Sequence, residues 1–185
     1  MMTQIQLLFG LLTSLLTLSS GLNAQAQIPG DRSSSDIQFA CGQSFDRNTQ
    51  QYVFTTFAWN SKHKKPIITW KQETFSDAGF DPQKRCETVS PKFQEAYANQ
   101  SLKFLTHGTI NGQPVICTSS LLGEDCQTLL ITLLPEDDPL QTLEQLSNIF
   151  LGYANSPLEQ SSAESIHEVG DRVYVEVDIE EFLNQ

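Results

Sequence analysis

The sequence predicts an α+β domain with a mostly antiparallel sheet of about six strands, two packed helices and two disulfides. Three observations support this prediction. Short β-branched and aromatic runs recur along the chain with polar turns between them, as strands do. Two longer segments carry apolar residues at helical spacing. An Asn-Gly dipeptide joins two of the strand-like runs, which is a strong hairpin signal.

Three strands are expected before the first helix, over residues 37–42, 52–59 and 66–71. The second of these runs is especially rich in β-branched and aromatic residues, which favour the extended conformation. A basic stretch, Lys62-His63-Lys64-Lys65, separates the second run from the third. We interpret this stretch as a solvated loop.

The first helix is expected to begin at Pro82. Asp81 supplies the N-cap, and proline is favourable at the first helical position. Pro91 lies on another face and predicts a kink or a break, with Ser90 available as a second N-cap. The buried stripe, at spacings of 3, 4 and 4, consists of Cys86, Val89, Phe93 and Tyr97.

A hairpin is expected next, with strands over residues 103–110 and 113–119. Both central residues of the type I′ turn at Asn111-Gly112 need positive φ, which Asn and Gly tolerate. The two-residue loop fixes the register. It places Ile110 opposite Gln113, Thr106 opposite Cys117 and His107 opposite Ile116. A further strand over residues 128–134 continues this meander.

The second helix is expected to open at Asp138-Pro139, again as an N-cap followed by proline, and to loosen at Gly152. Residues 155–170 are polar and weakly patterned, and we interpret them as a loop. Apolar and polar residues then alternate from Val173 to Glu180, which predicts a half-buried strand. The buried stripe of the second helix consists of Leu143, Leu146, Phe150 and Tyr153.

The four cysteines, Cys41, Cys86, Cys117 and Cys126, indicate two disulfides if the protein is exported. They can pair in three ways. Cys117 and Cys126 flank a short connection between two predicted strands, so a bridge there would staple a hairpin. We therefore expect Cys117 to pair with Cys126 and Cys41 with Cys86. The spacings resemble no zinc knuckle or ribbon.

Residues 1–26 are expected to be an export signal. An uncharged apolar run from Ile5 to Leu18 is followed by the small-residue site Ala24-Gln25-Ala26. The run is shorter than the roughly 20 apolar residues of a membrane span. The mature chain is then expected to begin at Gln27, with residues 27–36 as a flexible leader and residues 37–183 as a single domain.

Charge is unevenly distributed. The formal net charge is −11, and residues 27–135 contain as many basic as acidic residues. The part from residue 136 onward contains twelve acidic residues and one basic residue, Arg172. Binding of nucleic acid or anionic lipid through this acidic part is therefore disfavoured, and a cationic protein surface or divalent ions are favoured. The alternative is that the acidic residues only keep an exported protein soluble.

Two features are candidate partner contacts. Leu121 and Leu122 lie at the tip of the loop that a Cys117–Cys126 bridge would close, so they form a docking wedge or else fold back onto the core. The acidic row Glu176, Asp178 and Glu180 is the second candidate. Neither this row nor the triplet Glu136-Asp137-Asp138 has the pattern of a calcium loop, so no metal site is expected.

No common catalytic or cofactor motif is present: the sequence contains no G-x-S-x-G, H-E-x-x-H, Walker, G-x-G-x-x-G or C-x-x-C pattern. We therefore expect no catalytic residue and no cofactor. The three histidines, His63, His107 and His167, are far apart in the sequence. The alternative of an enzyme centres on His107 with a carboxylate that the sequence does not identify.

The motifs Phe39-Ala-Cys41, Pro66-Ile-Ile-Thr-Trp70, Arg85-Cys86-Glu-Thr-Val89-Ser90 and Asn111-Gly112-Gln-Pro-Val-Ile-Cys117 together resemble the cyanobacterial circadian-oscillating protein domain. The resemblance extends over roughly residues 37–182. It implies an exported or lumenal protein that associates peripherally with membranes, whose abundance follows a daily rhythm. It implies no catalytic activity and supplies no catalytic residue.

These observations lead us to expect a non-enzymatic accessory or binding protein in the periplasm, the thylakoid lumen or the extracellular space. It is expected to dock on a membrane complex with a basic surface and to bind no nucleic acid. An exported carrier of a small ligand or cation is the third alternative.

Overall fold

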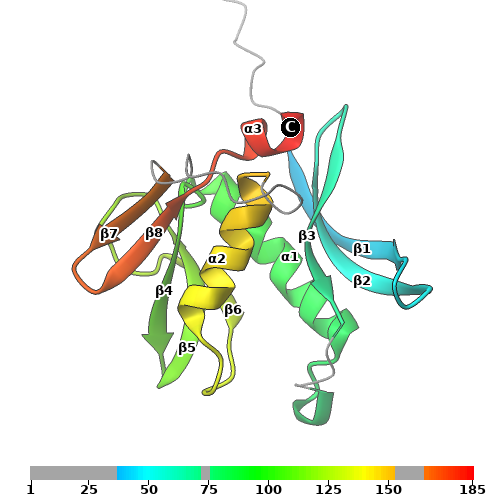
Figure 1. The fold of residues 1–185 in the computed structure, drawn as a ribbon, viewed down its shortest axis with the longest axis horizontal. Coiled ribbons are helices and arrows are strands. Elements are labelled where there is room, and N and C mark those ends of the chain that lie inside the picture. Colours follow the sequence, from blue (N-terminus) through cyan, green and yellow to red (C-terminus); the bar gives the residue numbers. More distant parts are fainter. Residues whose placement is uncertain (1–36, 72–75, 153–164) are drawn as a thin grey trace, which may run out of the picture. The chain divides into compact units, whose positions relative to one another are not determined.

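The computed structural model describes residues 37–71, 76–152 and 165–185 (Figure 1). The expected export signal (residues 1–26) and leader (residues 27–36) lie outside the described residues. So do Tyr153 and most of the connection that follows the second long helix. The α+β class is confirmed, although the described strands form two antiparallel sheets where the sequence predicted one.

The first sheet has the order β1-β2-β3 and contains β1 (Gln38–Asp46), β2 (Gln51–Trp59) and β3 (Lys64–Trp70). A bulge between Thr56 and Phe57 shifts the register between β2 and β3. Alternate residues of β1 face the first long helix, because Phe39 contacts the Phe93 ring and Cys41 is bonded to Cys86. The three predicted strands of this region are thus confirmed.

The second sheet has the order β6-β5-β4-β8-β7. The hairpin of β4 (Phe104–Ile110) and β5 (Gln113–Ser119) has the predicted register, with His107 opposite Ile116. The turn residues Asn111 and Gly112 have φ of 53° and 77°, as the turn type requires. The remaining strands are β6 (Thr128–Thr132), β7 (Ile166–Val169) and β8 (Arg172–Glu176).

Helix α1 (Pro82–Ala98) contacts all three strands of the first sheet as well as β6 of the second. Asp81 is the N-cap and accepts a hydrogen bond from the Lys84 N–H. The helix continues through Pro91, so of the predicted kink or break the break is wrong. The Pro91 side chain is exposed, and Ser90 is buried and bonded to Thr56 instead of capping a second helix.

A buried chain of polar groups joins three elements. The Trp70 indole N–H of β3 donates to the Thr56 hydroxyl of β2 over 3.0 Å. The Thr56 hydroxyl is also 3.0 Å from the Ser90 hydroxyl of α1. These contacts fix how α1 sits on the first sheet, because buried polar groups need their partners.

Helix α2 (Pro139–Phe150) begins at its predicted cap, where Asp138 accepts from the Leu140 N–H. It contacts β3, β4, β5 and β8. Its buried face consists of Leu143, Leu146, Ser147 and Phe150. The stripe that the sequence predicted is therefore confirmed for its described apolar members.

The C-terminal prediction is wrong in two places. The expected strand over residues 173–180 ends at Glu176, and a short helix, α3 (Ile179–Asn184), follows it. Asp178 is the N-cap of α3, and Phe182 and Leu183 join Ile179 in the core at helical spacing. Strand β7 also lies within the segment that was interpreted as a loop, where it pairs with β8 through a turn at Gly170.

Candidate docking surface

The connection between β5 and β6 is a closely held loop. The Cys117–Cys126 disulfide joins its two ends, and the Cys41–Cys86 disulfide joins β1 to α1, so both expected pairings are present. Within the loop, the Leu121 N–H donates to the Ser119 hydroxyl oxygen, and that hydroxyl donates to the Leu121 carbonyl over 2.6 Å. The Gln127 amide also donates to the Glu124 carboxylate over 2.7 Å.

The same loop is tied to β8. The Tyr174 hydroxyl donates to the Glu124 carbonyl over 2.8 Å, and the Tyr174 side chain is buried. The Arg172 guanidinium lies 2.7 Å from the Asp125 carboxylate. Hydrogen bonds to Asp125 and Tyr174 raise the pKa of Arg172, whose guanidinium is charged at every physiological pH in any case.

Two leucines project from this loop into solvent. The side chain of Leu121 is 58% exposed and that of Leu122 is 43% exposed. Val169 of β7 is 42% exposed and adjoins the loop, because a Cβ placed on Gly123 would lie 3.4 Å from its Cγ1. We call Leu121, Leu122 and Val169 the leucine patch. The alternative in which both leucines fold back onto the core is therefore wrong, and docking through them stays a prediction.

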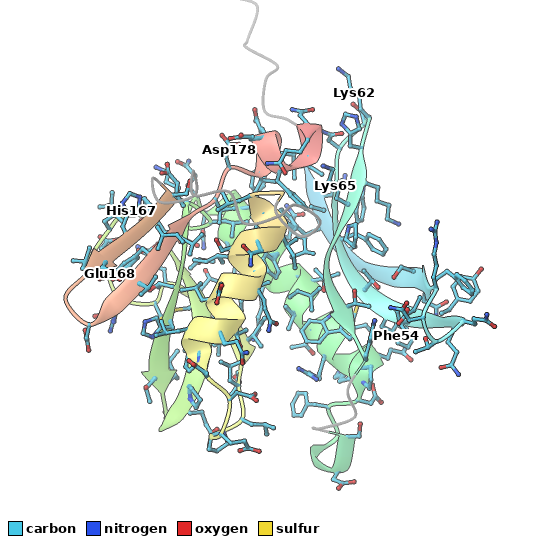
Figure 2. All side chains as sticks on the ribbon, in the orientation of Figure 1. Phe54, Lys62, Lys65, His167, Glu168 and Asp178 are labelled. Carbon is cyan, nitrogen blue, oxygen red and sulfur yellow. A yellow bond between two sulfur atoms is a disulfide. The ribbon has the colours of Figure 1, made fainter. Side chains whose placement is uncertain are left out.

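The three acidic candidates do not share one strand face. Glu176 ends β8 and lies 3.8 Å from the His167 imidazole of β7, whereas Asp178 caps α3 by accepting from the Glu181 N–H. Figure 2 shows His167 on β7 and Asp178 at the start of α3. Glu180 is exposed in the first turn of α3. Within residues 37–71, 76–152 and 165–185, no group of three or more His, Cys, Asp or Glu side chains could hold a metal ion.

His107 has a structural contact at the end of the β4–β8 ladder. That ladder stops at the pair of Thr106 and Tyr174, and the next N–H of β8, from Val173, donates to His107 Nε2 over 3.3 Å. Burial lowers the pKa of His107, the Arg172 charge adds to this, and Asp171 and Asp138 oppose it. The described residues include no carboxylate within 4.0 Å of this imidazole.

The basic stretch forms an exposed turn at the end of the β2–β3 hairpin, where Figure 2 shows Lys62 at the tip. Asn60 orders this turn by accepting from the N–H groups of Lys62 and His63, each over 2.8 Å. The Lys64 ammonium lies 4.1 Å from the centre of the Phe57 ring. The interpretation as a solvated loop therefore holds for Lys62 and His63 and is wrong for Lys64 and Lys65, which begin β3.

Sequence reasoning missed a cleft beside α1. Trp70 and Arg85 line two adjoining cavities of about 430 and 490 Å³, and the Arg85 guanidinium carbon lies 4.7 Å from the centre of the Trp70 ring. Both residues belong to motifs that the sequence singled out. No local signal could have revealed the cleft, because its walls come from β3, α1, β6 and α2, which are far apart in the chain.

No helix in the described part of the chain has both the length and the apolar character needed to cross a membrane. In comparisons with known proteins, the model of the family described as circadian oscillating protein COP23 matches residues 38–184. No curated protein and no solved structure matched. The family match covers both disulfides, the cleft and the leucine patch, and it extends over most of the sequence. The chain belongs to the circadian oscillating protein COP23 family.

Proposed function

We propose that this protein is an exported, non-enzymatic accessory protein that docks on a membrane protein complex through the leucine patch. The observation that carries the proposal is the exposure of Leu121 and Leu122 on a loop that is closed by a disulfide. Because each leucine is about half exposed, burying the remainder against a partner would contribute about 0.7–1.5 kcal/mol for each.

The rigidity of the loop supports docking over accidental exposure. A flexible loop loses side-chain and backbone freedom when it binds, at about 0.5–1.5 kcal/mol for each immobilised side chain. Here the disulfide, the Ser119 contacts with Leu121 and the Tyr174 bond to Glu124 hold the loop before any partner arrives. Little additional ordering is needed on binding.

The net charge of the protein favours a basic partner. The formal net charge is −11, and Asp178 and Glu180 are exposed near the C-terminus. Charges at the rim of an interface mainly accelerate association and select partners, and salt screens them. The proposed complex therefore forms faster at low ionic strength, while the leucine patch provides the affinity.

The proposed location is outside the cytoplasm, in the periplasm, the thylakoid lumen or the extracellular space. The apolar run and Ala24-Gln25-Ala26 site of residues 1–26 support export. Two disulfides that include every cysteine of the sequence fit an oxidising compartment. Attachment through a protein complex gives peripheral association with the membrane.

The proposal is tested by capture of the tagged mature protein on its own membranes, with Leu121→Ser/Leu122→Ser compared with Leu140→Ser. Leu140 is a matched control, because it is 47% exposed but lies on α2. We expect the double variant to capture at least tenfold less partner than the wild type. The control should capture as much partner as the wild type. Vesicles without protein separate attachment to a complex from attachment to lipid.

Equal capture by the double variant and the wild type would refute the leucine patch as the docking site. Equal binding to protein-free vesicles and to native membranes would refute a protein partner. Circular dichroism and thermal denaturation of both variants show that the comparison concerns folded proteins.

A further inference from the structure

The cleft beside α1 has the walls of an amphipathic pocket. Its cavity of about 430 Å³ falls within the usual range of small-molecule sites, which is about 300–1,000 Å³. Helix α1 forms one wall with residues one turn apart, and β6, an edge strand of the second sheet, forms the opposite wall. The apolar lining consists of Trp70, Phe80, Val89, Leu130 and Ile131.

Two cationic side chains, Arg85 and Lys92, also line this cavity. Arg85 and Lys92 lie two turns apart on the same face of α1, with Thr88 and Val89 between them. The described residues that line this 430 Å³ cavity include no carboxylate, whereas Asp137 lines the adjoining cavity together with Arg85. The 430 Å³ cavity is therefore cationic, although the whole chain has a net charge of −11.

The environment of both cations favours binding of an anionic ligand. Burial lowers the pKa of Lys92, with Glu95 as the opposing charge, and burial likewise lowers the pKa of Arg85, with Asp137 opposing it. In each case the loss of water outweighs the stabilisation by the neighbouring carboxylate. A carboxylate bound between them would restore this stabilisation through charge-assisted hydrogen bonds.

Polar groups that carry no charge complete the pocket. Thr88 of α1, Gln113 of β5 and Thr132 of β6 line the cavity, and each side chain can donate a hydrogen bond. Phe80 is 47% exposed at the wall, although aromatic rings of this size are usually buried. An apolar ligand body would cover this ring.

We propose that the cleft between α1 and β6 binds a small amphipathic carboxylate, with its apolar body against Phe80, Val89 and Leu130 and its carboxylate between Arg85 and Lys92. This site is separate from the leucine patch, so the proposal does not rest on the docking function. The charge and the shape of the cavity define the class of ligand.

The test uses decanoate as the probe and decanol as its uncharged counterpart. The sequence contains two tryptophans, so Trp59→Phe leaves Trp70 as the only one, and its fluorescence reports on the cleft directly. We expect saturable binding of decanoate and at least tenfold weaker binding of decanol. Isothermal titration calorimetry checks the same constants.

Variants locate the site. Lys92→Gln should weaken decanoate binding about tenfold without changing decanol binding, because the removed contact is ionic. Lys103→Gln is the matched control, since Lys103 is exposed and lies outside the cavity lining. Thr88→Trp fills the cavity and should abolish binding of both probes, while Leu121→Ser/Leu122→Ser should leave binding unchanged.

Several results would overturn the proposal: no saturable decanoate signal, equal affinity for the two probes, or equal loss in Lys92→Gln and Lys103→Gln. If Thr88→Trp does not fold, Lys92→Gln still decides the question. Loss of membrane capture with intact decanoate binding would refute the docking function alone, so the two proposals fail independently.

Discussion

His107 shows how one side chain can take the place of a backbone hydrogen bond. Its Nε2 accepts from the Val173 N–H at the point where the β4–β8 ladder has ended. Only a neutral imidazole can accept there, because both nitrogens of the charged form are donors. Protonation of His107 therefore breaks this contact, in agreement with the lowered pKa.

This contact predicts a pH dependence of stability. Because the folded protein holds the His107 pKa below its ordinary value of 6.5, the unfolded chain takes up the proton first as the pH falls. The contribution of His107 is complete above pH 6.5 and is lost progressively as the pH falls through the folded pKa. We expect His107→Gln, whose amide oxygen can still accept, to reduce this loss.

Urea denaturation at pH 7.5, 6.5 and 5.5 measures the effect. His63→Gln is the control, because His63 is exposed in the β2–β3 turn. If the unfolding free energy falls equally in the wild type and in His107→Gln as the pH is lowered from 7.5 to 5.5, His107 does not cause the loss of stability.

At the scale of elements, the two disulfides differ in the length of chain that they close. The Cys41–Cys86 bridge closes 45 residues and joins β1 to α1, whereas Cys117–Cys126 closes nine. In the loop-entropy model, the longer link adds about 4 kcal/mol to the free energy of unfolding and the shorter link adds about 2.6 kcal/mol. We expect Cys41→Ser/Cys86→Ser to lower the unfolding free energy more than Cys117→Ser/Cys126→Ser.

Thermal and urea denaturation of the two double variants check this order. Both cysteines of a pair are replaced together so that no free thiol can form a wrong bridge. A larger loss in the Cys117 and Cys126 variant would mean that strain or loop packing outweighs chain entropy.

The cap of α3 gives a prediction for the C-terminal element. Asp178→Ala removes the acceptor of the Glu181 N–H and should cost about 0.5–2 kcal/mol of stability. Asp178→Asn should cost much less, since asparagine caps helices about as well as aspartate. Hydrogen exchange at Glu181 and Phe182 reports α3 directly, and equal protection in both variants would exclude the capping role.

Elements with strong local signals could be predicted from the sequence. Asn111-Gly112 determined the β4–β5 register, and the Asp-Pro caps located the starts of α1 and α2. The C-terminal segment was ambiguous, because Val173 to Ile179 alternate as in a strand. The Asp178 cap and the burial of Ile179, Phe182 and Leu183, including the contact of Phe182 with the Phe150 ring, favour a helix from Ile179 onward.

At the scale of the whole molecule, the two-sheet arrangement and the cleft could not be predicted. Local patterns show which residues extend, but they do not show which strand edges pair. Strand β3 and strand β6 both remain edges, and α1 lies between the sheets to which they belong. The cleft is lined by residues of both edge strands and of α1, which are far apart in the sequence and carry no shared local signal.

The whole protein also carries a prediction about maturation. If residues 1–26 are an export signal, the protein isolated from its source begins at Gln27 and contains 159 residues. N-terminal sequencing and intact mass measure this directly, and the mass should also be lower by four hydrogens because of the two disulfides. A native protein that begins at Met1 would contradict export by this route.

The hydroxyl of Thr56 serves two partners that come from different elements, the Trp70 indole and the Ser90 hydroxyl. Thr56→Val keeps the shape of the side chain but removes the hydroxyl, so both partners stay buried without a hydrogen-bonding group. This should lower the free energy of unfolding by about 1–3 kcal/mol for each unsatisfied group. Substitutions at these three positions are therefore interdependent: Trp70→Phe or Ser90→Ala should be tolerated better after Thr56→Val than before it. In related sequences, this predicts that the three residues change together.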